Sequence, residues 1–174
     1  MGPQDIQCIR RNTKKLIDTH LMIENPGNYV ELFADLGVDI IYIHPEAENH
    51  PARSLSKIKA LGKFAGIAIN PGTSIETVQE LFPLLDYIII MTVNPGFAGQ
   101  EYLKFVNNKI KRLISIKKQF EFNIMVDGAI SPQRIQQLSD YGVDGFILGT
   151  SALFGKDETY KTIISKLKDE EKFK

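Results

Sequence analysis

The chain has 174 residues, of which 43% are hydrophobic and 24% charged, a size and composition typical of one globular domain with a substantial core. Its 21 basic and 21 acidic side chains give a formal net charge of zero, so there is no electrostatic case for binding nucleic acid or an acidic membrane. One cysteine excludes an intrachain disulfide, and the N-terminus shows no secretory pattern. We therefore expect a soluble cytoplasmic protein.

Short aliphatic runs alternate along the chain with longer segments of helical periodicity. A first helix is expected over 3–12. Strands are expected to begin near residues 16, 39, 64, 86, 122 and 144. Each strand precedes an expected helix, over 26–36, 52–61, 74–82, 101–118, 131–141 and 158–168. Strand alternating with helix predicts an α/β fold with a parallel sheet, and no linker interrupts it, so 1–174 is expected to be a single domain.

Helix boundaries carry recognisable signals. Helices are expected to start at Asn25-Pro26, at Thr73 with Glu76, and at Ser131-Pro132. Three glycines stand where left-handed C-caps are needed: Gly37, Gly62 and Gly142.

Three successive strands end in loops of small residues. The run 86–93 leads into a loop containing Gly96 and Gly99, and the next two strands end at 127–129 and 149–151. Parallel strands closed into a barrel share one rim at their C-terminal ends, where ligands bind. A single glycine loop is more often an ordinary turn, but three at consecutive strand ends predict an anion site made of backbone N–H groups.

Six segments together carry a family resemblance: 20–26, 43–46, 70–73, 91–100, 126–128 and 149–151. In order and spacing they resemble the ribulose-phosphate 3-epimerase family, including its allulose-6-phosphate 3-epimerase branch. His44-Pro45-Glu46 and Gly149-Thr150-Ser151 favour the allulose branch, because the pentulose branch more often has His-Val-Glu and Gly-Ser at these positions.

The resemblance implies a TIM (β/α)8 barrel, of which this chain is expected to contain only the last six β/α units. The first strand, its helix and the second strand would be missing, as in a partial barrel domain that begins at an internal methionine. The alternative is a genuine open sheet of six strands. The open sheet would leave apolar edges at 16–23 and 145–148, which invite self-association, and we expect a homo-oligomer.

The resemblance also implies a reaction. A phosphorylated ketose would be inverted at C3, converting D-ribulose 5-phosphate to D-xylulose 5-phosphate or D-allulose 6-phosphate to D-fructose 6-phosphate. Two acid/base aspartates exchange the proton through an enediolate, and a divalent metal (Zn, Fe, Mn or Co) assists. The family holds this ion with two histidines and two aspartates.

Asp127 matches the seventh-strand acid and metal ligand, and His20 matches the third-strand metal ligand, which also lies against substrate. Without the resemblance, Asp127 is as readily a turn residue, and His20 is more often a hydrogen-bonded core residue. The second-strand aspartate and histidine have no counterpart, so two of the four metal ligands are absent. We therefore expect the chain as written to be inactive or nearly so.

The remaining substrate contacts are implied by position. They are two methionines around the reacting carbons, Met22 and Met91; a loop over the substrate, Gly96, Phe97, Ala98 and Gly99; and a phosphate cradle, Gly128, Ala129, Gly149, Thr150 and Ser151. The family usually has glycine at 98 and 129, so a methyl group there narrows the pocket or restricts the backbone.

Other rim residues are expected to contribute less. Glu46 lies at a strand end and could supply a carboxylate to the rim, although it ranks below Asp127 and the alternative is a solvated loop charge. His44 and His50 are interpreted as structural or solvent-facing side chains rather than metal ligands. The alternative function is a non-catalytic phosphate-binding barrel fragment. A related barrel lyase or isomerase is disfavoured, because no lysine stands at a matching strand end.

Overall fold

The computed structural model describes residues 2–172 and contains one six-stranded parallel sheet, with the strands in chain order. The strands are β1 (Asp18–Leu21), β2 (Ile40–Ile43), β3 (Phe64–Ile69), β4 (Tyr87–Met91), β5 (Asn123–Asp127) and β6 (Gly145–Ile147). Every predicted strand is confirmed to within two residues. Each strand pairs in parallel with the next strand in the chain. Every connection therefore runs from the C-terminal end of one strand back to the N-terminal end of the next.

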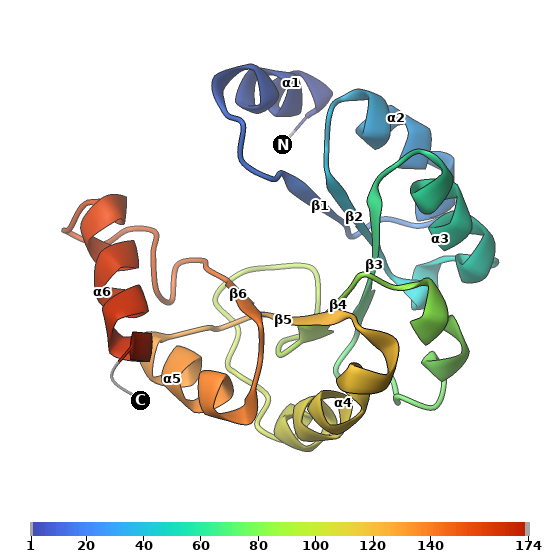
Figure 1. Ribbon diagram of the computed structural model, residues 1–174. Helices are drawn as coiled ribbons and strands as arrows, with labels where there is room; N and C mark the ends of the chain where they lie inside the picture. The colour runs from blue at the N-terminus through green and yellow to red at the C-terminus, as the bar shows by residue number, and fades with distance from the viewer. Residues whose placement is uncertain (1, 173–174) are drawn as a thin grey trace.

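Helices follow the strands and lie along the convex side of the curved sheet (Figure 1). The α-helices are α1 (Pro3–Asn12), α2 (Val30–Asp35), α3 (Pro51–Ala60), α4 (Val106–Phe120), α5 (Pro132–Tyr141) and α6 (Tyr160–Lys172). Short 3-10 helices are η1 (Pro26–Asn28), η2 (Pro45–Ala47) and η3 (Gln79–Leu84). The architecture is therefore an α/β half-barrel.

The predicted helix over 74–82 is wrong, because its capping residues have other partners. The Thr73 hydroxyl donates to Glu46 Oε1, and Glu76 pairs with Arg112. Only the 3-10 helix η3 forms, and it contains Pro83, which has no N–H to donate. The predicted helix over 26–36 likewise divides into η1 and α2, and the one over 101–118 begins only at Val106.

The other boundary signals behave as expected. Ser131 Oγ accepts the Arg134 N–H at 3.3 Å and caps α5. Gly37, Gly62 and Gly142 have φ values of 85°, 70° and 99°, the left-handed conformation that ends a helix at low steric cost for glycine.

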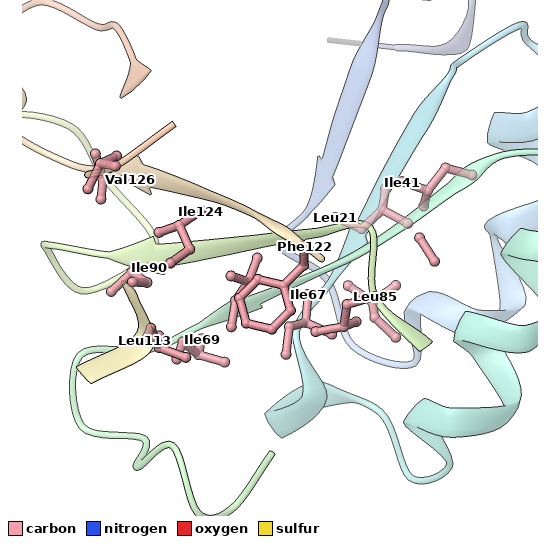
Figure 2. Packing of buried hydrophobic residues seen from close by; sticks show 14 of the residues in the cluster. Leu21, Ile41, Ile67, Ile69, Leu85, Ile90, Leu113, Phe122, Ile124 and Val126 are labelled. Carbon is pink, nitrogen blue, oxygen red and sulfur yellow. The ribbon is translucent and has the colours of Figure 1, made fainter. Parts of the chain in front are cut away.

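Both faces of the sheet are apolar, as is typical of parallel strands covered on two sides. The convex face contributes Ile41, Ile67, Ile90 and Ile124, which are fully buried against helix side chains such as Leu113 (Figure 2). Alternate residues on the concave face form a second, smaller cluster: Ile40, Tyr42, Ala68, Ile89, Met91 and Val93.

The described sheet has two edges, because β1 pairs only with β2 and β6 only with β5. Leu16 and Met22, which flank β1, are large apolar residues exposed at this edge. These edges agree with the sequence expectation, and self-association through them stays a prediction. Within residues 2–172, no helix has the length and apolar character needed to cross a membrane.

Candidate active site

A cavity of about 330 Å³ opens at the C-terminal ends of β4, β5 and β6. Of the thirteen residues that the sequence places at the site, all but His20 line it. Asp127 and eleven proposed substrate contacts form much of its wall: Met22, Met91, Gly96, Phe97, Ala98, Gly99, Gly128, Ala129, Gly149, Thr150 and Ser151. The structure thus brings the predicted residues together, while their role in binding remains a prediction.

The loop after β4 folds back on itself beside this cavity. The Gln100 side chain donates to the carbonyls of Asn94 at 2.6 Å and Phe97 at 2.9 Å. Gly96 and Gly99 have φ values of 131° and 86°, so the tight loop depends on glycine at both positions. Phe97, 73% exposed, stands at the edge where it could cover a bound ligand.

The loop after β5 is fastened to the end of β4. The Thr92 hydroxyl donates to the carbonyls of Asp127 at 3.0 Å and Gly128 at 2.5 Å. Gly128 has φ 120°, and a Cβ on it would lie 2.9 Å from the Val93 backbone nitrogen, so only glycine fits. Ala129 has φ 51°, a left-handed conformation that a side chain disfavours. The backbone at Ala129 therefore adopts this conformation at a steric cost that glycine would avoid.

The loop after β6 completes the cradle. The Gly149 carbonyl accepts N–H groups from Ala152, Leu153 and Phe154, which turns the chain tightly. Within the described protein, the backbone N–H groups of Thr150 and Ser151 donate no hydrogen bond. The residues that line the cavity include no lysine or arginine among those described. An anion here would be held by backbone donors and not by a cationic side chain.

Asp127 and His20 face each other across the concave side of the sheet. Asp127 Oδ2 lies 3.4 Å from His20 Nδ1, and the two side chains are 19% and 12% exposed. Asp127 ends β5 and His20 belongs to β1, so three strands separate them in the sheet order. The curvature of the sheet (Figure 1) is what brings them together.

His20 also contacts His44, the first residue after β2. The two Nε2 atoms are 2.8 Å apart, and the rings stack with centroids 4.9 Å apart. His44 is only 4% exposed, and its Nδ1 lies 3.6 Å from Glu46 Oε2. The sequence analysis interpreted His44 as structural or solvent-facing. It did not predict that His44 contacts His20, the proposed metal ligand, directly.

The interpretation of Glu46 as a solvated charge is wrong. Its side chain is 26% exposed and accepts hydrogen bonds from the Asn70 N–H, at 2.9 Å, and from the Thr73 hydroxyl. Burial by itself would raise the pKa of Glu46, but His44 and these two donors outweigh it and lower the pKa to about 2. The only sequence signal was a histidine and a glutamate two residues apart at the end of a buried strand.

Asp18, two residues before His20 on the same face of β1, is a carboxylate that the sequence analysis missed. The pKa of Asp18 is raised above its ordinary value. Burial is the largest cause and the Asp127 charge acts in the same direction, whereas the His20 charge lowers the pKa. Asp18 therefore belongs to the electrostatic surroundings of the site. In residues 2–172, however, no three His, Cys, Asp or Glu side chains lie close enough together to form a metal site.

Comparison with solved structures defines the class of protein. KGPDC from Streptococcus mutans superposes with a TM-score of 0.75 at 17% identity, covering 99% of this chain and 79% of that one. The tryptophan synthase alpha-subunit of Pyrococcus furiosus gives 0.68 at 15% identity, covering 97% of this chain and 70% of that one. At these identities the likeness shows only the fold, an α/β half-barrel similar to TIM-barrel proteins.

Sequence comparison then gives the family. Residues 1–154 match the model of the "Ribulose-phosphate 3 epimerase family". The ribulose-phosphate 3-epimerase of Bacillus subtilis is 36% identical, covering 94% of this chain and 76% of the relative. That of Synechocystis is 40% identical, covering 88% and 68%. This chain belongs to the ribulose-phosphate 3-epimerase family, a family of isomerases.

Proposed function

We propose that this chain carries the phosphate cradle and one acid/base group of an enzyme that inverts C3 of a phosphorylated ketose. The observation that carries the proposal is the position of Asp127. Asp127 lines the same cavity as the loop of Gly149 to Ser151, and its carboxylate faces His20. A phosphate in the cradle would therefore fix the distance of the sugar carbons from Asp127.

Asp127 would transfer the proton at C3. A carboxylate acts as general acid or base when it comes within hydrogen-bonding reach of the proton that it moves. The surroundings suit this task, because Met22 and Met91 line the same cavity and exclude water from one side of the substrate. Phe97 on the β4 loop would cover the substrate after it binds.

A divalent metal fits His20 Nδ1 and Asp127 Oδ2, the two facing donors on the concave side. Imidazole nitrogen and carboxylate oxygen are ligands that Zn, Fe, Mn and Co all accept. When bound, such an ion stabilises negative charge on the oxygens of the reacting sugar. Catalytic ions usually have three or more protein ligands, so two donors should give weak affinity.

We further propose that the six β/α units correspond to the last six of the eight units of a TIM barrel. Six of eight is three quarters, and this chain covers 76% of the Bacillus subtilis relative and 68% of the Synechocystis relative. The position of Asp127 at the end of β5 then corresponds to the seventh barrel strand.

D-ribulose 5-phosphate is the first substrate to test, because the relatives are named for it. D-allulose 6-phosphate is the second, because of the motifs at 44–46 and 149–151. Turnover of both sugars should be assayed with added Zn, Mn, Fe or Co, and calorimetry should compare each sugar with inorganic phosphate. An epimerase binds sugar and metal together, even where turnover is slow.

The rival is a phosphate-binding fragment without catalysis. It is favoured by the absence of any third metal donor at the His20–Asp127 pair among the described residues. Such a protein would bind inorganic phosphate as tightly as the sugar phosphates and would gain nothing from metal. Turnover rates comparable to those of a full-length epimerase would instead exclude the non-catalytic fragment. They would also contradict our expectation of low turnover.

Self-association through the edge strands is the proposed assembly. β1 and β6 each offer one unpaired side among the described strands. Sedimentation velocity over a range of concentrations would detect it, and a monomer at all concentrations would exclude it.

A further inference from the structure

We propose that Thr92 is a positioning residue, whose buried hydroxyl holds the peptide group between Gly128 and Ala129 so that the Ala129 N–H faces the cavity. The consequence for phosphate rests on the proposed function, because it requires an anion bound by backbone donors. The orientation of the peptide group is a property of the folded chain and can be tested without any ligand.

Thr92 lies just after β4, is fully buried, and is fixed by its own backbone. Its N–H donates to the Asp127 carbonyl at 2.8 Å, and its carbonyl accepts the Leu103 N–H at 2.9 Å. Its hydroxyl faces two acceptors, the carbonyls of Asp127 at 3.0 Å and Gly128 at 2.5 Å. The Asp127 carbonyl already has the Thr92 N–H, whereas the Gly128 carbonyl has no other donor in the described chain. The hydroxyl therefore acts mainly on Gly128.

The carbonyl of Gly128 fixes the direction of the next N–H. In a planar trans peptide group the carbonyl and the N–H point in opposite directions, so the Ala129 N–H faces away from Thr92. The cavity wall contains Gly128 and Ala129 but, among the described residues, not the buried Thr92. Within residues 2–172 the Ala129 N–H donates no hydrogen bond. It is therefore available to an anion in the cavity.

The orientation that Thr92 holds is the strained one. Ala129 has φ 51°, a left-handed conformation in which its Cβ is crowded by the backbone. Half a turn of the peptide group would move Ala129 to the extended region, where an alanine has no such strain. Gly128 resists this rotation little, because it has no Cβ. The hydrogen bond from Thr92 opposes it, because the rotation carries the Gly128 carbonyl away and turns the Ala129 N–H out of the cavity.

NMR of the ligand-free, full-length chain can report the orientation. A strong nuclear Overhauser effect between the amide and Hα protons of one residue indicates a positive φ, because the left-handed conformation brings these protons together. We expect this signal for Ala129 in the wild type and in Thr92→Ser, which keeps the hydroxyl. Thr92→Val has almost the same shape without the hydroxyl and should lose the signal.

Calorimetry with inorganic phosphate is the second readout. The loss of one backbone donor to an anion should weaken binding about tenfold in Thr92→Val, whereas Thr92→Ser should bind like the wild type. Thr77→Val is the matched control, because the exposed Thr77 hydroxyl pairs with Ser74 and does not line the cavity. It should leave phosphate binding unchanged.

Ala129→Gly separates positioning from packing. Glycine tolerates both orientations of the peptide group, so phosphate can select the binding orientation without strain at residue 129. The double variant Thr92→Val with Ala129→Gly should therefore recover most of the binding lost in Thr92→Val. If Thr92 served only to pack the interior, the loss would be the same with alanine or glycine at 129, and that result would overturn the proposal.

The two proposals fail in different ways. A wild type without the left-handed signal at Ala129, or a Thr92→Val variant that keeps it, would overturn the positioning role. If the signal depends on the Thr92 hydroxyl but the wild type binds no phosphate, the anion site fails and the positioning role stands.

One measurement needs no variant. Inorganic phosphate should shift the amide proton resonance of Ala129 in the wild type, because that N–H would gain a charged acceptor. An unshifted resonance in protein saturated with phosphate would overturn the role of Ala129 as a donor, even if Thr92→Val did not fold. Circular dichroism identifies any variant that fails to fold.

Discussion

The rim of this half-barrel has two regions that are built in different ways. The ends of β4, β5 and β6 form a cavity lined by small residues, where backbone N–H groups are the donors. The ends of β1 and β2 instead present imidazole and carboxylate side chains, joined by a hydrogen bond between His20 and His44 and by a 3.6 Å contact between His44 and Glu46. Asp127 at the end of β5 belongs to both regions, since it lines the cavity and faces His20.

The comparison shows what each kind of site requires. A site made of backbone groups depends on local conformation. It is therefore sensitive to the φ angles of single residues and to whether a Cβ can be accommodated at each of them. A side-chain site depends on distant segments meeting, so it needs the curvature that sets β1 opposite β5. Variants that alter one region and leave the other intact therefore test whether the proposed anion binding by the backbone is separable from the proposed chemistry of the side chains.

The largest effect is expected for Asp127→Asn. An amide of the same shape can neither accept the proton nor bind a cation strongly, so any metal-assisted turnover should fall about 10²- to 10⁴-fold. Manganese binding, followed by electron paramagnetic resonance, should also be lost. Phosphate binding should persist because the cradle is backbone. Asp35→Asn, an exposed residue of α2, is the control, and equal losses in both variants would contradict the assignment.

Gly128→Ala should destabilise the fold by about 2 to 4 kcal/mol, from left-handed backbone strain and overpacking against Val93. Chemical denaturation measures this. Gly149→Ala is the matched comparison, because its Cβ would meet nothing within 4 Å. It should leave stability nearly unchanged and weaken phosphate binding by filling the cradle. Similar stability losses in both variants would refute the distinction.

Glu46 should make the fold sensitive to acid. Its pKa falls from 4.5 to about 2 on folding, so its stabilisation is complete above pH 4.5 and is lost as the pH falls toward about 2. Each pKa unit corresponds to about 1.4 kcal/mol, which gives an upper value of about 3 kcal/mol. Glu46→Gln should flatten the stability profile between these pH values. An unchanged slope would contradict the burial and hydrogen bonding described for Glu46.

The smallest effect is expected for Ala129→Gly. This substitution removes the steric strain of an alanine in the left-handed conformation. The gain is partly offset by the greater conformational freedom of glycine in the unfolded chain, so the net stabilisation should be about 0.5 to 1 kcal/mol. Ala98→Gly is the control, since Ala98 has no positive φ and should gain nothing. Thermal unfolding distinguishes the two, and a loss of stability at 129 would show that methyl packing dominates.

Two failures of sequence interpretation share one cause. Thr73 and Glu76 have the spacing of a capping box, yet Thr73 is drawn to Glu46 across the rim. Glu46 itself looks like a surface charge until Asn70 and Thr73 are placed beside it. In both cases a contact between residues more than 20 positions apart outweighs a local preference, and no pattern in a single sequence reports such a contact.

The sequence by itself determined where the strands begin, that they form a parallel sheet, and where the glycines of the proposed anion cradle lie, because periodicity and left-handed φ angles are properties of short segments. Only the tertiary structure decided that His20 meets both Asp127 and His44. His44 in turn lies beside Glu46. Those meetings depend on how far the sheet curves, which follows from the packing of six strands and their helices together.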